Sequence, residues 1–122
     1  MKTMDAPINF AFLHGGGQGS WVWAETIAAL RQQAGNHLQI LNLDVPGCGT
    51  KRGRETSQTE VADIVSELLA EIDAAELPGL VLVGHSQAGT VLPALLERRP
   101  ELFRRAIYVT CSIPLPGQTI LQ

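Results

Sequence analysis

Positive charge is scarce in this sequence. Nine Lys and Arg residues stand against twelve Asp and Glu, which gives a formal net charge of −3. A chain with this balance offers no extended basic surface, so we expect neither nucleic acid nor an anionic membrane as a partner. The one short basic run, residues 51–54, is typical of a solvated loop rather than of a binding patch.

Cysteine and long apolar runs are also scarce. The two cysteines, Cys48 and Cys111, lie in separate predicted loops and form no metal-ligand pattern. No apolar stretch is long enough to span a membrane, and the first residues lack the apolar core of a signal peptide. We therefore expect a cytoplasmic protein, because a reduced setting is the default for a chain with so few cysteines.

Four short apolar segments alternate with helical patterns along the chain. The strand candidates are residues 8–13, 38–43, 79–84 and 105–110. Strands that alternate with helices are typical of a parallel sheet covered by helices. The sequence therefore predicts a single α/β unit, with a mainly parallel sheet and flanking helices.

Helix signals lie between these strands. Ser20 can cap a helix that stops at Gly35. Residues 57–60 form a capping box that would open a second helix. A third helix would span residues 88–99, where Pro93 must kink it or delay its start.

The most informative segment, residues 79–89, is an apolar strand that runs into Ser86 and then into a helix. This context is typical of a G-x-S-x-G nucleophile elbow, in which the serine sits on a strained turn at positive φ. Gly84 and Ala88 leave the space that such a turn needs, although Ala88 replaces the second glycine of the common form. The alternative is a plain turn that joins a strand to a helix.

A glycine-rich loop, residues 14–20, follows the first strand candidate. Its unshielded backbone N–H groups can face either an oxyanion in acyl transfer or a phosphate group. A dinucleotide fingerprint is matched only in part. Gly15 and Gly17 fit it and Asp44 ends the next strand, but Ser20 stands at the third glycine position. A Walker A motif is excluded, because no Gly-Lys-Ser or Gly-Lys-Thr follows the glycines.

Three motifs together resemble the α/β-hydrolase superfamily, in its esterase and hydroxynitrile-lyase branch. They are His-Gly-Gly-Gly-Gln-Gly-Ser-Trp-Val-Trp at 14–23, Asp-Val-Pro-Gly-Cys-Gly at 44–49 and Gly-His-Ser-Gln-Ala-Gly at 84–89. Their order and spacing cover nearly the whole chain. The resemblance implies that the four strands lie in the spatial order second, first, third, fourth.

The same resemblance implies a role for each site residue. Ser86 would be the nucleophile. The backbone N–H of Gln87 and those of Gly16 and Gly17 in the glycine loop would form the oxyanion hole. No cofactor-binding or metal-ligating residue is expected.

A serine nucleophile needs a base, and histidine is scarce. The chain has three, His14, His37 and His85. None stands where the superfamily places its base, which is after the last strand. Beyond the elbow the sequence has no histidine and only two acids, Glu97 and Glu101.

We therefore expect residues 1–122 to be the N-terminal portion of a single α/β-hydrolase domain, with the cap and the C-terminal half absent or in a second chain. The strand at 105–110 would be an open edge. The last residues, 119–122, carry no helix-stop signal. An isolated piece of this kind would be inactive, because removal of triad members leaves only about 10³–10⁴-fold catalysis over water.

The function expected for the complete protein is that of a serine hydrolase, esterase-like, which attacks a small ester through an acyl-enzyme at Ser86. One alternative is a lyase on the same scaffold. A second is a non-catalytic fragment or binding module, and a third is an NAD(P)-binding reductase that uses the glycine loop.

Overall fold

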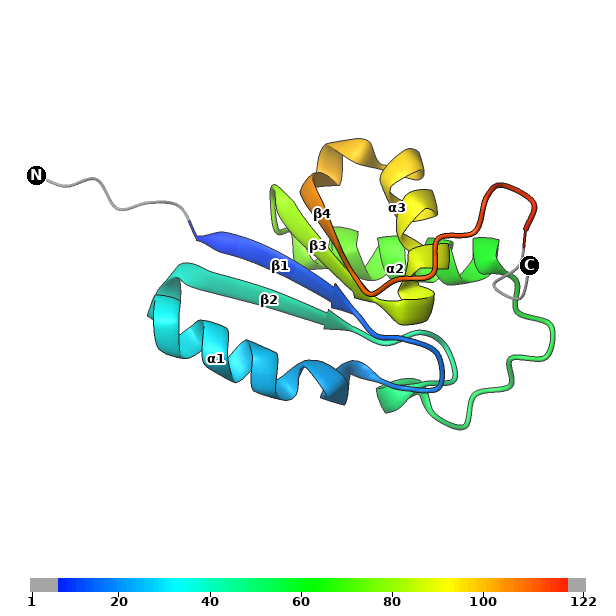
Figure 1. Cartoon of the computed structure of the whole chain (residues 1–122), viewed down its shortest axis with the longest axis horizontal. Coiled ribbons are helices and arrows are strands. Elements are labelled where there is room, and N and C mark those ends of the chain that lie inside the picture. Colours follow the sequence, from blue (N-terminus) through cyan, green and yellow to red (C-terminus); the bar gives the residue numbers. More distant parts are fainter. Residues whose placement is uncertain (1–6, 119–122) are drawn as a thin grey trace, which may run out of the picture.

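The protein is built on one four-stranded parallel sheet (Figure 1). The computed structural model describes residues 7–118. The strands are β1 (Ile8–Leu13), β2 (Leu38–Leu43), β3 (Leu80–His85) and β4 (Phe103–Val109). They lie in the order β2-β1-β3-β4, and all three pairings are parallel. The predicted fold class and strand order are confirmed.

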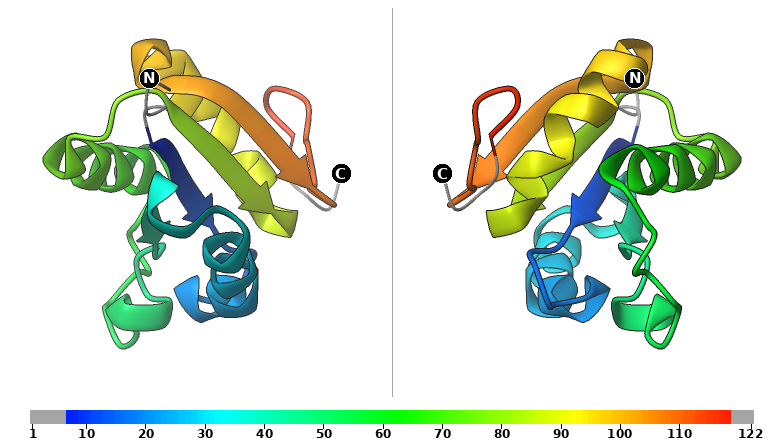
Figure 2. Two further views of the ribbon diagram at one scale, coloured as in Figure 1. Left: turned by 90° about the vertical axis from the view of Figure 1, so that its left-hand side faces the viewer. Right: turned by 90° about the vertical axis from the view of Figure 1, so that its right-hand side faces the viewer.

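Helices cover both faces of the sheet. They are α1 (Ala24–Ala34), α2 (Val61–Ala75) and α3 (Leu92–Arg98). Short 3₁₀ turns join them to the strands at Ser20–Trp23, Gly35–His37, Gly49–Lys51, Ser86–Thr90 and Pro100–Leu102. Seen along the sheet, α1 lies on one side, while α2 and α3 lie on the other (Figure 2).

Strand β3 carries the core, because its alternating side chains enter both layers. Leu80 and Leu82 pack with residues of α2 and α3, whereas Val81 and Val83 pack with Phe12 and the first turn before α1. All four side chains are buried, as expected for a central parallel strand. The register pairs Leu13 with Gly84, so β1 and β3 end side by side.

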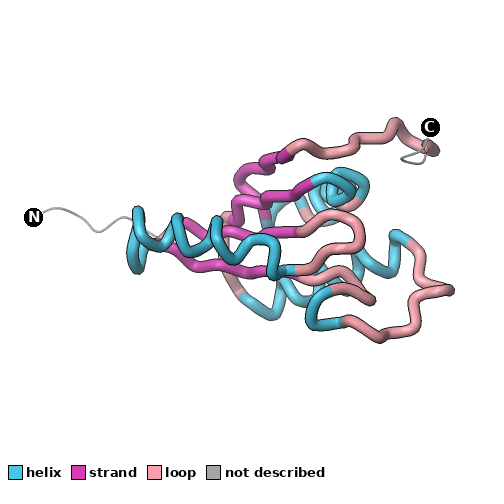
Figure 3. Tube along the Cα trace, turned by 60° about the horizontal axis from the view of Figure 1, so that its bottom comes forward, coloured by secondary structure: helices cyan, strands magenta, loops and turns pink. Residues whose placement is uncertain are grey.

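The loops that leave the carboxyl ends of the strands gather at one end of the molecule (Figure 3). Ligands of open parallel sheets bind at this edge. The glycine loop leaves β1 there and the elbow leaves β3 there. The fold therefore brings together two motifs that are about seventy residues apart, as the resemblance to the superfamily implies.

Strand β4 lies at the edge of the sheet, and within residues 7–118 it pairs with β3 alone. Ile107 and Val109 project from it with exposed fractions of 41% and 39%. An open edge at this strand is what the sequence predicts. The expectation about residues 119–122 lies outside the described residues.

Two of the predicted helix starts are wrong in detail. The hydroxyl of Ser20 caps no helix, because it donates to the carboxylate of Asp44 instead. Helix α2 begins after Glu60 rather than after Ser57, and the N–H of Glu60 donates to Asp63 Oδ2 at 2.9 Å. The third helix starts late, at Leu92, with Pro93 in its first turn, where a missing N–H costs nothing.

Among the described residues, no helix combines the length and the apolar character needed to cross a bilayer.

Candidate active site

Ser86 directly follows β3 and is the first residue of the 3₁₀ turn that precedes α3. Its φ is +54°, in the left-handed region that costs free energy for a residue with a Cβ atom. Gly84 is required here, because a Cβ on it would lie 2.7 Å from the side chain of Leu92. The predicted strained turn is confirmed. Ser86 is half-buried, and its carbonyl accepts the N–H of Ser112 at 3.0 Å.

The glycine loop lies directly against this turn. A Cβ on Gly15 would come within 3.0 Å of Ser86 Cβ and 3.3 Å of the His85 carbonyl oxygen. The prediction that the loop lies beside Ser86 is therefore confirmed, and the missing side chain is the reason it can approach so closely.

The three amides of the loop are not equivalent. The N–H of Gly15 donates to Gln18 Oε1 at 2.9 Å, so this group is already used. Gly16 and Gly17 are exposed. On the other side, Gln87 stands in the first turn after the strand, where an N–H has no acceptor within its own turn. The amides of Gly16, Gly17 and Gln87 are thus the candidates for an oxyanion hole, a role that stays a prediction.

Gln18 is a site residue that sequence reasoning missed. Besides the N–H of Gly15, its Oε1 atom faces the Nδ1 atom of His85 at 3.4 Å. The side chain thereby joins the first loop to the end of β3. A lone glutamine in a glycine-rich loop carries no local signal of such a contact, because the partner is 67 residues away.

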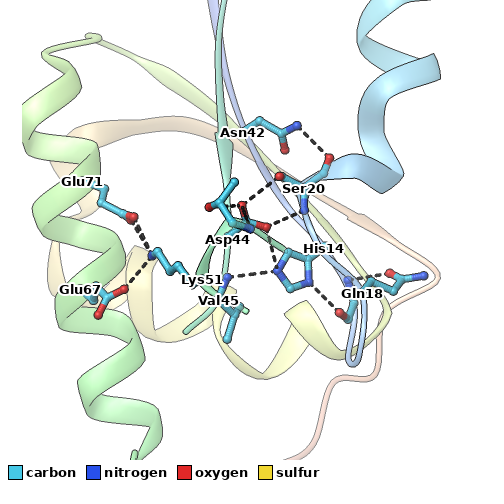
Figure 4. A network of polar contacts seen from close by, with 11 residues as sticks. His14, Gln18, Ser20, Asn42, Asp44, Val45, Lys51, Glu67 and Glu71 are labelled. Atoms are coloured by element: carbon cyan, nitrogen blue, oxygen red, sulfur yellow. Dashed lines mark hydrogen bonds and ion pairs between the residues drawn. The ribbon is translucent and has the colours of Figure 1, made fainter. Parts of the chain in front are cut away.

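His14 contacts the backbone of the glycine loop and of the segment after β2 (Figure 4). Its Nδ1 atom is 2.7 Å from the carbonyl oxygen of Gly15, and its Nε2 atom accepts the N–H of Val45 at 3.1 Å. These contacts require a neutral ring with the proton on Nδ1. The side chain is buried and both nitrogens are engaged, so His14 supports the loop and is not available as the base.

Asp44 is the centre of a second part of the same network (Figure 4). Its Oδ1 accepts the N–H of Ser20 at 2.6 Å, and its Oδ2 accepts the Ser20 hydroxyl at 2.9 Å and the Thr50 hydroxyl at 2.8 Å. Burial alone would raise the pKa of this carboxyl, but the hydrogen bonds from Ser20 and Thr50 outweigh it and lower the pKa.

This arrangement removes the basis of the dinucleotide interpretation. The acidic residue in that fingerprint must reach the hydroxyls of a ribose. The Asp44 carboxylate is 4% exposed and already accepts hydrogen bonds from two residues of the protein. Ser20, at the third glycine position, is one of these partners.

The other two histidines do not face Ser86 either. His85 lies on the α1 side of the sheet, with its ring edge-on to Trp23 at 6.4 Å. His37 lies just before β2, at the opposite end of a parallel strand from the site. Within the described residues, therefore, no histidine is positioned to take a proton from Ser86.

The basic run predicted to be a solvated loop is in fact tied to α2 (Figure 4). Lys51 Nζ lies 2.7 Å from both Glu67 Oε2 and Glu71 Oε1, and Arg54 binds Glu67 through two parallel contacts of 2.8 Å. Hydrogen bonds from Arg54 and then from Lys51 lower the pKa of Glu67 to about 2. The pairs fix the segment between β2 and α2, which forms one wall of the site.

A pocket of about 270 Å³ opens beside the elbow. The glycine loop and Gln87 form one side of it, and Val61 and Ile64 of α2 form part of the other. Cys48 also lines it, and both cysteines of the protein are free thiols. Among the described residues, no group of His, Cys, Asp and Glu side chains is arranged to hold a metal ion.

Comparison with known proteins gives consistent results. The chain is 35% identical to the probable esterase PIR7A of Oryza sativa subsp. indica over 93% of its length, and 32% identical to the putative methylesterase 12, chloroplastic, of Arabidopsis thaliana over 89%. It covers 43% and 31% of those two proteins, so it spans less than half the length of either relative.

The fold is also that of solved structures. An extracellular alpha/beta-hydrolase from a Paenibacillus species superimposes with a TM-score of 0.80 at 23% identity, over 93% of this chain and 44% of the other. Residues 10–121 match the alpha/beta hydrolase family. With the strand order, the strained serine turn and the glycine loop beside it, this match shows that the chain belongs to the alpha/beta hydrolase family.

Proposed function

We propose that this chain carries the nucleophile and the oxyanion-binding amides of an esterase that acts on a small carboxylic ester. The observation that carries the proposal is Ser86 at φ +54°, at the end of a buried parallel strand, with Gly15 packed against its Cβ atom. The relatives at 35% and 32% identity are named as an esterase and a methylesterase, which supports an ester as the substrate.

In this proposal Ser86 Oγ attacks the carbonyl carbon of the ester and loses its proton to a base. The carbonyl oxygen becomes an oxyanion, which accepts hydrogen bonds from the N–H groups of Gln87 and of Gly16 or Gly17. The alcohol then leaves with a proton, and water later releases the acid and restores the serine. Loss of one such donor costs about 10²–10³ in rate in known enzymes.

The base is the part that the described residues do not supply. His14 is saturated with hydrogen bonds, and His85 faces the α1 side of the sheet. A serine hydroxyl without a base is a weak nucleophile. We propose that the base and its orienting acid lie outside residues 7–118, and that the 122-residue chain alone does not turn over esters at an appreciable rate.

A base added in solution tests separately whether Ser86 is the nucleophile and whether the described residues lack its base. The purified chain is incubated with a fluorophosphonate probe, with and without added imidazole, and adducts are located by peptide mass spectrometry. We expect Ser86 Oγ to displace fluoride while imidazole takes the proton, so labelling of Ser86 rises with imidazole.

Two controls belong to this experiment. The Ser86→Ala variant must lose the adduct, and Ser112, which lies beside the elbow, serves as an internal reference in the same digest. Equal labelling of Ser86 and Ser112 at every imidazole concentration would contradict the proposed nucleophile.

A further inference from the structure

The pocket beside the elbow carries no formal charge on its walls. Its side chains are mostly apolar and come from the segment after β2, from helix α2 and from the residue before α3, such as Val45, Ile64 and Val91. None of the lining residues is Asp, Glu, Lys or Arg. Away from the backbone amides, a charged group bound here would find no counter-ion among the lining side chains, which is unfavourable.

The polar atoms that do line the pocket are largely satisfied. Both ring nitrogens of His14 are hydrogen-bonded. The hydroxyl of Thr90 donates to the carbonyl oxygen of Gln87 at 2.8 Å. What is left for a ligand is the backbone N–H of Gly16, Gly17 and Gln87, at the side where the ester carbonyl would lie, with the side-chain amide of Gln87 and the thiol of Cys48. The other lining side chains offer apolar contact.

A wall separates this pocket from a larger open groove of about 1010 Å³. Val61, Gln87 and Thr90 line both spaces, so they stand between them. The side chain of Gln87 packs directly against the backbone of Gly16. A Cβ atom on Gly16 would overlap Gln87 Oε1, so this packing is possible only because position 16 has no side chain.

The pocket is also small. Sites that enclose a drug-sized ligand measure roughly 300–1,000 Å³, and this one measures about 270 Å³. It therefore has room for one short substituent of an ester and not for an extended chain, unless the wall at Gln87 moves.

We infer that this pocket binds a short, uncharged, apolar substituent of the ester, and that Gln87, packed against Gly16, is the specificity-determining residue that limits its length. The inference rests on the proposed function for the identity of the ligand. It defines the substrate class further: esters with a compact neutral group beside the oxyanion amides, and not esters with an anionic or a long-chain group at that position.

Cys48 allows the pocket to be probed without turnover, because it lines the pocket as a free thiol. Alkyl methanethiosulfonates transfer their alkylthio group to a thiolate and release a sulfinate. We would measure the rates for methyl, butyl, decyl and anionic sulfonatoethyl reagents in the Cys111→Ser chain. A free thiol in solution, N-acetylcysteine, provides the intrinsic rate of each reagent.

After this normalisation, we expect the methyl and butyl reagents to react at Cys48 at least about tenfold faster than the decyl and the anionic reagents. Gln87→Ala should bring the decyl rate to within about twofold of the butyl rate and leave the anionic reagent slow. Gly16→Ala should do the same, because its new methyl group displaces only the flexible end of Gln87. Leu115→Ala, which alters the groove but not the pocket, should change nothing.

The inference is overturned if the reagents show no discrimination by length or charge at Cys48, or if Gln87→Ala and Gly16→Ala leave the decyl reagent slow. Because thiol labelling does not involve Ser86, such a failure leaves the fluorophosphonate result untouched. Conversely, an unreactive Ser86 beside a selective pocket would contradict the proposed function and not the pocket.

Discussion

Gly15 lies so close to Ser86 that a Cβ on the glycine would be 3.0 Å from the Cβ of the serine. Two segments about seventy residues apart in sequence thus meet in van der Waals contact at the carboxyl edge of the sheet. The contact places the elbow and the glycine loop against each other, and it leaves no room at Gly15 for even one methyl group.

We predict that Gly15→Ala destabilises the fold by about 1–3 kcal/mol, the usual range for overpacking, and slows imidazole-assisted labelling of Ser86. The new methyl group would also lie 2.9 Å from Gln18 Oε1 and 3.3 Å from the His85 carbonyl oxygen. Urea unfolding and mass spectrometry measure the two effects. Gly16→Ala is the matched control, since it meets only the end of a flexible side chain; an equal loss of stability in both variants would contradict this account.

A second prediction concerns the strain at the elbow. At φ +54°, the backbone conformation is about 1 kcal/mol less favourable for a residue with a Cβ atom than for glycine. Ser86→Gly should therefore be more stable than Ser86→Ala by about this amount. Glu76, at φ 52° after α2, is the matched reference. The free energy of unfolding of Glu76→Gly should exceed that of Glu76→Ala by a similar amount. Equal urea midpoints for Ser86→Gly and Ser86→Ala would show that the turn is unstrained.

The Asp44 network should contribute much of the stability of the site. Asp44→Ala leaves the Ser20 N–H, the Ser20 hydroxyl and the Thr50 hydroxyl without their acceptor, and we expect a loss of about 3 kcal/mol. Thr50→Val removes one side-chain donor and should cost about 1 kcal/mol. The free energy of unfolding of each variant is the measurement. If Asp44→Ala and Thr50→Val lose nearly the same free energy of unfolding, the hydrogen bonds of the Asp44 carboxylate to Ser20 do not stabilise the fold.

Glu67 gives the protein a defined acid response. Its pKa falls from an ordinary value of 4.5 to about 2 because Arg54 and Lys51 bind the carboxylate. A depressed pKa in the folded state contributes stability that is present above the unfolded pKa and lost as the pH falls through the folded pKa. We therefore expect the free energy of unfolding to decline between pH 4.5 and about 2.

The Glu67→Gln variant identifies the source of that decline. It should be less stable than the parent near neutral pH and show a shallower pH dependence in the same window. Glu25→Gln, on the exposed side of α1, is the control and should follow the parent curve. A parent and a Glu67→Gln curve of identical slope would assign the acid response to other groups.

The sequence predicts the elbow well because the features that make it are local. An apolar run, a serine and small neighbours all lie within residues 80–88, and Ser86 has the predicted positive φ. The strand order comes from the resemblance to the superfamily rather than from the apolar pattern, and the structure confirms it.

The features that sequence reasoning misses are the long-range polar pairs. Ser20 has the local signature of a helix cap, yet Asp44, 24 residues away, is the better acceptor for its hydroxyl. The sequence around Lys51 predicts a solvated charge, but in the fold Lys51 forms ion pairs with Glu67 and Glu71 of α2. Gln18 has no local signal at all. These contacts depend on tertiary placement, which no pattern within a few residues encodes.

The most direct test of the account is acetylation of Ser86 by p-nitrophenyl acetate, followed by intact mass and peptide mapping of the 122-residue chain. The account predicts negligible acetyl-Ser86 without an added base, an amount that rises with imidazole, and none in Ser86→Ala. Absence of acetyl-Ser86 at every imidazole concentration would contradict the assignment of the nucleophile. Rapid, Ser86-dependent acetylation and turnover without imidazole would contradict the conclusion that His14, His37 and His85 do not serve as its base.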